Sequence, residues 1–176
     1  MPKVVTIGWE LEYALQENGM KQKELAAATK TPNATVSDHV QGGGVRLEKL
    51  SDYVEALNTD RLRGQASYET YGFIKSMDGK VAEILTPTEL DFLQDQETIQ
   101  REERREHAKV LLIKSKLEPL TRKDREDLER YVMEFLDEIV VELSIVFSIL
   151  KILGMTITTA FNKRMPHWIE KKYMKG

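Results

Sequence analysis

The stretch at residues 20–42, MKQKELAAATKTPNATVSDHVQG, limits what the chain can fold into more than any other feature. Its pattern predicts a helix over about residues 21–29, a tight turn, and a second helix over residues 32–41. Thr31 is a suitable N-cap for the second helix because Pro follows at the first helical position. The glycine run 42–44 ends that helix. The segment therefore predicts two short helices packed close together.

Helices are also predicted on both sides of this pair. Apolar residues recur at helical spacing over residues 4–18, with Thr6 as the expected N-cap. After the glycines, residues 47–57 place Leu and Val at the same spacing. With a short fifth helix, these elements predict a helical domain over residues 1–63.

The second helix of the central pair carries short polar side chains near its N-terminal end, where a DNA-reading helix contacts base edges in the major groove. Asn is a natural bidentate partner of adenine, and Thr and Ser can donate or accept a hydrogen bond. The preceding helix would give its N-terminus to a phosphate. The candidate base contacts are Asn33, Thr35, Ser37 and Asp38, and the candidate phosphate contacts are Lys21, Gln22 and Lys23.

Residues 7–58 resemble the helix-turn-helix domain of the Xre family, the Cro and CI type of phage and plasmid repressors. That family has Gln-x-x-Leu-Ala in the second helix, a Thr-Ile-Ser-like core in the recognition helix, then Gly and a Leu-rich helix. The matching segments are Gln22-Lys23-Glu24-Leu25-Ala26, Thr35-Val36-Ser37, Gly42 and Leu47-Glu48-Lys49-Leu50. The resemblance implies a mainly all-α chain whose N-terminal part is a five-helix domain of the lambda-repressor-like type.

The resemblance also implies a set of DNA contacts and a function. The residues placed at bases are Asn33, Ala34 and Asp38, and those placed at phosphates or the minor groove are Gln22, Arg46 and Lys49. A protein of this type would be a sequence-specific transcriptional repressor that binds double-stranded DNA as an oligomer on paired half-sites.

Four positions depart from the family pattern. Pro32 stands where the start of the recognition helix usually has a polar residue. Lys30 stands where the turn usually has Gly, which implies a positive φ or a different turn. Asp38 stands where Arg, Gln or Lys is common, and a carboxylate there can accept a hydrogen bond only from a base such as cytosine. His39 replaces an apolar residue, and we expect a partly buried, hydrogen-bonded histidine rather than a pH switch.

Residues 64–86 predict a linker or a small hairpin. An Asp78-Gly79 turn would join residues 73–77 to residues 80–85, although a helix that ends at Gly79 also fits. Thr86, followed by Pro and then by Glu at the third helical position, begins a long helix. A Pro near residue 119 ends this helix and Thr121 caps another. Residues 87–176 are therefore predicted to form a helical oligomerisation or effector domain with a basic tail.

The last long helix carries a heptad seam typical of a coiled coil. Further apolar residues widen its face, which favours a bundle or a higher oligomer, so a homodimer or homotetramer is expected. The alternative is packing within one subunit. The seam residues are Val132, Leu136, Ile139, Leu143, Val146, Leu150 and Leu153.

Charge is distributed unevenly along the chain, which has a net charge of −3. Residues 1–64 carry −1, residues 65–150 carry −7 and residues 151–176 carry +5. The near-neutral N-terminal part predicts weak non-specific DNA binding. The basic tail is expected to touch DNA or an acidic partner, and the acidic segment allows a second reading in which residues 64–176 bind another protein while the N-terminal domain regulates its own gene.

Other classes of function have little support in the sequence. Residues 143–161 are apolar enough for a membrane anchor, but Lys151 would lie near the bilayer centre, so an anchor is disfavoured. There is no Cys, which fits a cytoplasmic protein, and the three His lack metal-ligand spacing. With no phosphate-binding loop or nucleophile motif either, we expect no enzyme activity, no metal and no cofactor.

Overall fold

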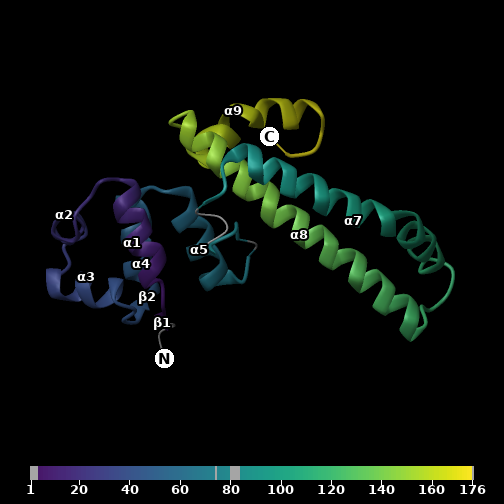
Figure 1. Cartoon of the computed structure of the whole chain (residues 1–176), viewed down its shortest axis with the longest axis horizontal. Helices are drawn as coiled ribbons and strands as arrows, with labels where there is room; N and C mark the ends of the chain where they lie inside the picture. The colour runs from purple at the N-terminus through teal and green to yellow at the C-terminus, as the bar shows by residue number, and fades with distance from the viewer. Residues whose placement is uncertain (1–3, 74, 80–83, 176) are drawn as a thin grey trace. The chain divides into compact units, whose positions relative to one another are not determined.

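The structure, a computed structural model, describes residues 4–73, 75–79 and 84–175 (Figure 1). These residues divide into two compact units. The first unit comprises the described residues of 1–78 together with those of 150–176, and the second comprises those of 79–149. The mainly all-α fold is confirmed, because the described residues contain only two short strands besides the helices.

Most elements lie in the first unit. It contains β1 (Val4–Val5), α1 (Gly8–Glu17), α2 (Gln22–Ala28), α3 (Asn33–Val40), β2 (Val45–Arg46), α4 (Leu47–Leu57), α5 (Asp60–Tyr71) and α9 (Ile157–Glu170). The second unit contains α7 (Pro87–Lys114) and most of α8 (Arg122–Ile152), whose last residues belong to the first unit.

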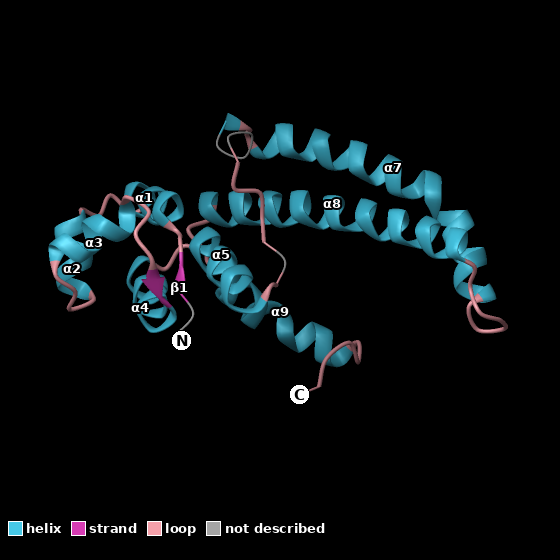
Figure 2. Ribbon diagram, turned by 90° about the horizontal axis from the view of Figure 1, so that it is seen from below, coloured by secondary structure: helices cyan, strands magenta, loops and turns pink. Residues whose placement is uncertain are grey.

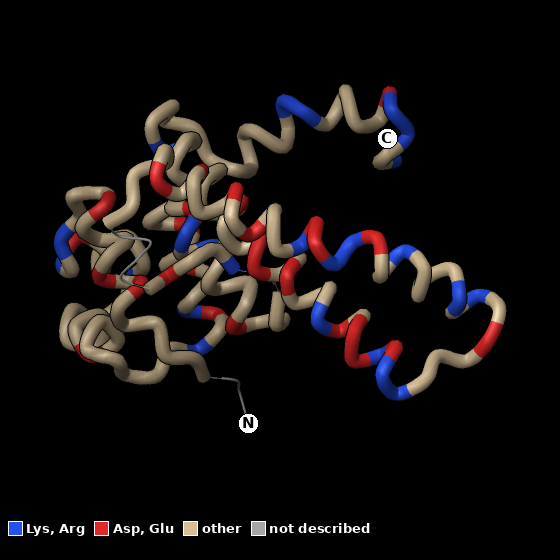
Figure 3. Tube along the Cα trace, turned by 45° about the vertical axis from the view of Figure 1, so that its right-hand side comes forward, with Lys and Arg blue, Asp and Glu red and all other residues tan. Residues whose placement is uncertain are grey.

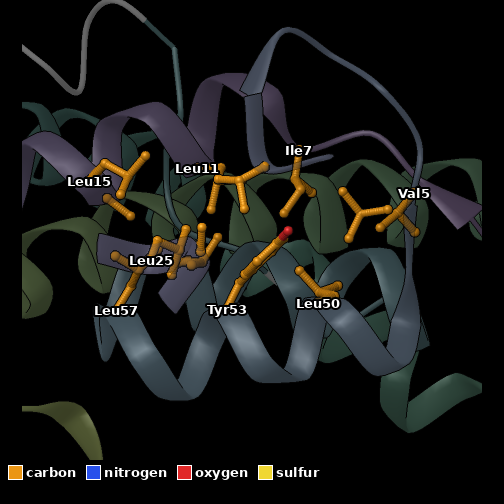
Figure 4. Packing of buried hydrophobic residues seen from close by; sticks show 13 residues of the cluster. Val5, Ile7, Leu11, Leu15, Leu25, Leu50, Tyr53 and Leu57 are labelled. Carbon is orange, nitrogen blue, oxygen red and sulfur yellow. The ribbon is translucent and has the colours of Figure 1, made fainter. Parts of the chain in front are cut away.

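The core of the first unit is built by the helices that the apolar spacing predicted. Leu11 from α1 and Leu25 from α2 are fully buried, and so is the ring of Tyr53 from α4. Figure 4 shows the labelled side chains of α1 and α4 pointing toward one another. Each such side chain contributes about 1.5–3 kcal/mol by leaving water, so this cluster holds α2 and α3 against a rigid support.

The start of the chain differs from the predicted helix over residues 4–18. Val4 and Val5 form β1, which pairs antiparallel with β2 so that Val5 faces Val45. Both of these Val side chains are buried, and β-branched residues suit a strand. The helix begins only at Gly8, after a fully buried Ile7 in the N-cap position, so Thr6 is not the cap. Burial of Ile7 outweighs the hydrogen bond that a Thr cap would form.

The cap of α3 also differs from the prediction by one residue. Pro32, not Thr31, is in the N-cap position. The Thr31 hydroxyl lies 2.9 Å from the Thr29 hydroxyl and 3.2 Å from the Thr29 carbonyl oxygen, to which it donates. Thr31 therefore closes the end of α2 instead of opening α3.

Helix α5 corrects the predicted linker over residues 64–86, because it continues to Tyr71. Leu62 and Gln65 are buried, which anchors the helix past the Gly at position 64. The predicted hairpin includes Ile74 and residues 80–83, which lie outside the described residues. The described part of residues 72–86 contains no strand.

The second unit is dominated by a helical hairpin, with α7 and α8 side by side in both views (Figures 1 and 2). Both predicted caps are present. Glu89 N–H donates to the Thr86 hydroxyl at 3.3 Å, and Asp124 N–H donates to the Thr121 hydroxyl at 3.2 Å. The buried residues of α8 are Glu138, Val141, Ser144 and Leu150, and of these only Leu150 belongs to the predicted seam.

The apolar stretch at residues 143–161 is not one helix. It is interrupted between α8 and α9, near Gly154 with φ +59°, and the two helices are bent by 103°. Among the described residues, no single helix is long and apolar enough to cross a membrane. Helices α8 and α9 together, as a bent pair, have the length and the apolar composition of a membrane span.

Candidate nucleic-acid interface

Helix α3 presents one face to the core and the other to solvent. Val36 is fully buried, His39 is 7% exposed, and Val40 packs against the core one turn after Val36. On the opposite side, the side chains of Ala34 and Asp38 are exposed, one helical turn apart. This outer face is exposed and can therefore enter the major groove of DNA.

The five residues predicted to contact bases all belong to α3, but they do not share one orientation. Asn33, Ala34 and Asp38 are exposed, whereas Thr35 and Ser37 are half-buried. Gln41, which was not among the predicted base contacts, is exposed at the C-cap of α3. Spacings of three, four and seven residues put it on the face of Asp38, Ser37 and Ala34. That spacing was visible in the sequence and could have identified Gln41.

Asp38 is turned toward the loop that follows α3. Its backbone carbonyl oxygen accepts a hydrogen bond from Gly43 N–H at 2.8 Å. Its carboxylate lies so close to Gly43 that a Cβ there would collide with it. The Asp38 carboxylate therefore lies at the rim of the face, against the loop that follows α3.

The start of α2 offers the predicted phosphate-binding end. Lys21 and Lys23 are exposed and Gln22 is half-buried, and the positive end of the helix dipole lies here. Glu24 folds back so that its carboxylate accepts a hydrogen bond from Lys21 N–H at 2.8 Å. One acid thus competes with a phosphate for the amides of this terminus.

Of the two remaining predicted phosphate contacts, one is exposed and the other is engaged within the domain. Arg46 is exposed at the N-cap of α4. Lys49 instead donates to the Thr29 carbonyl oxygen at 3.2 Å and to the Asp52 carboxylate at 2.6 Å. It ties α4 to the C-terminal end of α2, so its ammonium group is already occupied within the domain.

Two local features set the turn and the approach of α3. Lys30 between α2 and α3 has φ +50°, the left-handed conformation that its place in the turn implied. Gly8 at the start of α1 lies against the end of α3. A Cβ on Gly8 would be 2.6 Å from the Val40 carbonyl oxygen and 2.8 Å from Gly42 N. Only a residue without a side chain fits there.

A buried polar pair joins α3 to the core. His39 Nδ1 lies 2.8 Å from the Tyr53 hydroxyl, and the two rings meet edge to face with centroids 5.7 Å apart. Burial lowers the pKa of His39; nearby Asp38 opposes this shift and Lys49 adds to it. Burial also raises the pKa of Tyr53. Both side chains are therefore neutral near pH 7, and the expected buried, hydrogen-bonded histidine is confirmed.

Together, the helix pair, the tight turn and the outward polar face define a helix-turn-helix DNA-binding domain. Residues 10–60 match the model of the Cro/C1-type HTH DNA-binding domain family, so this part of the chain is a domain of that family and the protein is a DNA-binding regulator. No curated protein and no solved structure matches the chain. Among the residues that the structure describes, no group of three or more His, Asp and Glu is placed to hold a metal ion.

Proposed function

We propose that the protein is a transcriptional repressor that reads DNA with α3 and acts as an oligomer on paired half-sites. The observation that carries this proposal is the outward polar face of α3 in a domain of the Cro/C1 type. The charge of that domain supports the oligomer. Residues 10–60 carry five Lys and Arg but nine Asp and Glu, so one copy gains little from phosphate neutralisation. Linking two weak readers raises affinity by avidity.

The hairpin of the second unit combines buried apolar side chains, such as Leu111 and Val141, with ionic and polar contacts between its two helices. Thr98 on α7 donates to the Glu138 carboxylate on α8 at 2.6 Å, and Arg101 forms an ion pair with the same carboxylate. Near the tip, Lys114 Nζ lies 2.7 Å from the Asp124 carboxylate. An ionic pair contributes less to stability than apolar packing of similar volume, so this hairpin gains from covering its apolar side chains elsewhere.

Part of the predicted seam is exposed on the surface of α8. In the predicted seam, Val132 is 49% exposed, Val146 is 39% exposed and Leu153 is 61% exposed, while Leu136, Ile139 and Leu143 are half-buried and Leu150 is buried. A stripe of this kind, at heptad spacing on a long helix, suits a second copy of α8. The seam therefore remains our proposed subunit interface.

The test of the oligomer compares two neighbouring substitutions. Val132→Asp places a charge in the seam, whereas Met133→Asp places one beside it, at a residue of nearly equal exposure, 47%. Light scattering of the full-length protein should give a dimer or tetramer for the wild type and for Met133→Asp, and a smaller species for Val132→Asp. A monomeric wild type would contradict the oligomer.

The test of repression uses selection of bound sequences from a random duplex pool at two salt concentrations. The enriched sequence should contain two related half-sites, and it should lie upstream of a gene whose transcription the protein lowers. A protein that enriches no sequence is not a sequence-specific repressor.

A second candidate function is a regulator that acts on another protein through the second unit. It is favoured by the net charge of residues 79–149, which is −6, and by exposed apolar residues such as Phe92 and Leu117. An α3 variant that has lost sequence preference separates the two functions. If that variant retains the biological effect, the second unit carries the main function.

A further inference from the structure

The first unit contains two segments of very different charge. Residues 1–78 carry nine Lys and Arg and eleven Asp and Glu, while residues 150–176 carry six and one. The whole unit therefore has a net charge of +3, although its helix-turn-helix part is acidic. Figure 3 shows the Lys and Arg positions of the last segment along α9 and at the C-terminus. The basic tail thus belongs to the same compact unit as the DNA-binding domain.

Two polar contacts fasten this segment to the domain. Lys151 Nζ lies 2.8 Å from the Glu17 carboxylate on α1, and it also lies 5.9 Å from the centroid of the Tyr13 ring. Ile157 N–H, at the start of α9, donates to the Asp60 carboxylate on α5 at 2.7 Å. A carboxylate at a helix N-terminus is favoured by the helix dipole. Asp60 therefore acts as an external cap that holds the first turn of α9.

The attachment point is close to the end of α2 that faces phosphate in a helix-turn-helix complex. Glu17 is the last residue of α1, and only four positions separate it from Lys21 at the N-cap of α2. Four residues span at most about 14 Å. Lys151, at the start of this segment, is thus attached within a short distance of the proposed phosphate contacts.

The cations of α9 and the residues after it have free ends. All five are exposed, and within the part of the chain that the structure describes none forms an ion pair or a side-chain hydrogen bond; they are Lys163, Arg164, Lys171, Lys172 and Lys175. On α7, by contrast, Lys109 and Lys114 are both paired with carboxylates. Unpaired cations remain available to neutralise phosphates.

We propose that α9 and the residues after it bind the DNA backbone beside the site that α3 reads. This inference rests on the proposed function. The tail supplies the positive charge that the domain over residues 10–60 lacks. It does so without reading sequence, because phosphate contacts fix position but not specificity. A helix of the length of α9 covers about 20 Å, enough to reach several phosphates of one strand.

The aromatic residues of α9 raise the alternative of an anionic lipid surface. Phe161 and Trp168 contact each other edge to face, with centroids 5.0 Å apart, so each covers part of the other's apolar surface. This contact, together with the attachment of α9 to the DNA-binding domain, favours DNA over a lipid surface as the ligand of α9. Lipid binding is kept as an outcome of the test.

The test uses matched triple variants of the full-length protein. Lys163→Gln, Arg164→Gln and Lys171→Gln remove three tail cations. The control, Lys116→Gln, Lys123→Gln and Arg125→Gln, removes two exposed Lys and one exposed Arg from the second unit. Both variants have the same net charge. Affinity for a random duplex is measured between 50 and 200 mM salt, and each lost phosphate contact lowers the slope of log K against log salt by about 0.9.

The tail variant should lose up to about 2.7 from this slope, while the control keeps the wild-type slope and both keep the selected sequence. An unchanged slope in the tail variant overturns the inference, and pelleting of the wild type, but not the tail variant, with phosphatidylserine vesicles would then assign α9 to lipid. A changed slope without any sequence preference would instead contradict the proposed repressor. A wild type that binds no duplex at 50 mM salt would contradict both.

Discussion

The imidazole of His39 and the hydroxyl of Tyr53 form a buried hydrogen bond, 2.8 Å from Nδ1 to oxygen, that ties the recognition helix α3 to α4. His39 is 7% exposed and Tyr53 is fully buried, so neither group can turn to water. A polar pair in this place fixes the rotation of α3 about its axis, because any rotation would break the bond without a replacement. The outward direction of the polar face depends on that rotation.

Removal of the hydroxyl should therefore weaken the domain. Tyr53→Phe leaves a buried ring nitrogen of His39 unsatisfied, at a cost of about 1–3 kcal/mol in the free energy of unfolding. Urea unfolding followed by the fluorescence of Trp9, with Trp168→Phe in the background, measures this change in the first unit. Tyr71→Phe is the control because that ring is 84% exposed. An equal loss of free energy of unfolding in Tyr53→Phe and Tyr71→Phe would show that the hydrogen bond to His39 does not stabilise the domain.

The same pair predicts a dependence of stability on pH. Burial lowers the pKa of His39 in the folded protein below the value of about 6.5 in the unfolded chain. The unfolded state then binds more protons between the two pKa values, so stability rises with pH across that window. The contribution is complete above about pH 6.5 and is lost as the pH falls toward the lowered pKa.

Urea unfolding at a series of pH values between 5 and 8 measures this effect. The His39→Leu variant has no group to titrate at this position, and its loss of stability toward pH 5 should be smaller than that of the wild type. If the two pH profiles are parallel, His39 is not responsible for the decline.

The parts of the fold that local signals determine were predicted well. The bounds of α4 follow its apolar spacing, and the start of α7 follows the cap formed by Thr86 and Glu89. The structure departs from the prediction where distant segments meet. The β1–β2 pairing depends on the return of Val45 to Val5, and no local pattern at residues 4–7 reveals that partner.

In the candidate DNA-binding site, too, local features could be predicted and features that depend on distant contacts could not. Its helix and its exposed residues Asn33 and Ala34 follow from spacing, as does Gln41 in retrospect. The orientation of Asp38 could not be predicted, because it depends on how closely Gly43 approaches the end of α3. The engagement of Lys49 with the carbonyl oxygen of Thr29, 20 positions away, likewise depends on helix packing.

Lys30 is a position where one substitution should stabilise the protein. Its φ of +50° costs a residue with a Cβ about 1 kcal/mol or more relative to Gly. Lys30→Gly should therefore raise the free energy of unfolding by about 1 kcal/mol. Lys23→Gly is the control: it removes the same charge inside α2 and should lower stability by about 1 kcal/mol. Destabilisation by both substitutions would contradict the strain at Lys30.

At Gly8, the addition of a side chain should destabilise the protein, whereas the removal of one at Lys30 should stabilise it. In Gly8→Ala the new Cβ would overlap the Val40 carbonyl oxygen and Gly42 N, so α3 must move. We expect a loss of about 1–3 kcal/mol in stability, together with weaker DNA binding. Gly79→Ala is the control because nothing lies within 4 Å of a Cβ there, and it should change stability by less than about 0.5 kcal/mol. Unaltered stability and DNA affinity in Gly8→Ala would contradict the tight fit.

The outer face of α3 yields a prediction that separates base contacts from phosphate contacts. Asn33 and Gln41 are exposed amides that can each form a bidentate pair with a base. Asn33→Ala and Gln41→Ala should each relax specificity at one base position by about 1–3 kcal/mol. Lys21→Ala, at the start of α2, should weaken binding to every duplex alike and reduce the salt slope by about 0.9.

Selection from a random pool, followed by binding titrations on single-base variants of the enriched sequence, measures all three substitutions. The two amide variants are expected to relax different base positions, since the residues lie more than two helical turns apart. Gln96→Ala on α7, a substitution of an exposed amide in the second unit, is the control and should keep the full sequence preference. If Asn33→Ala and Gln41→Ala lose affinity uniformly, as Lys21→Ala does, then these amides contact the backbone and other residues of α3 must read the bases.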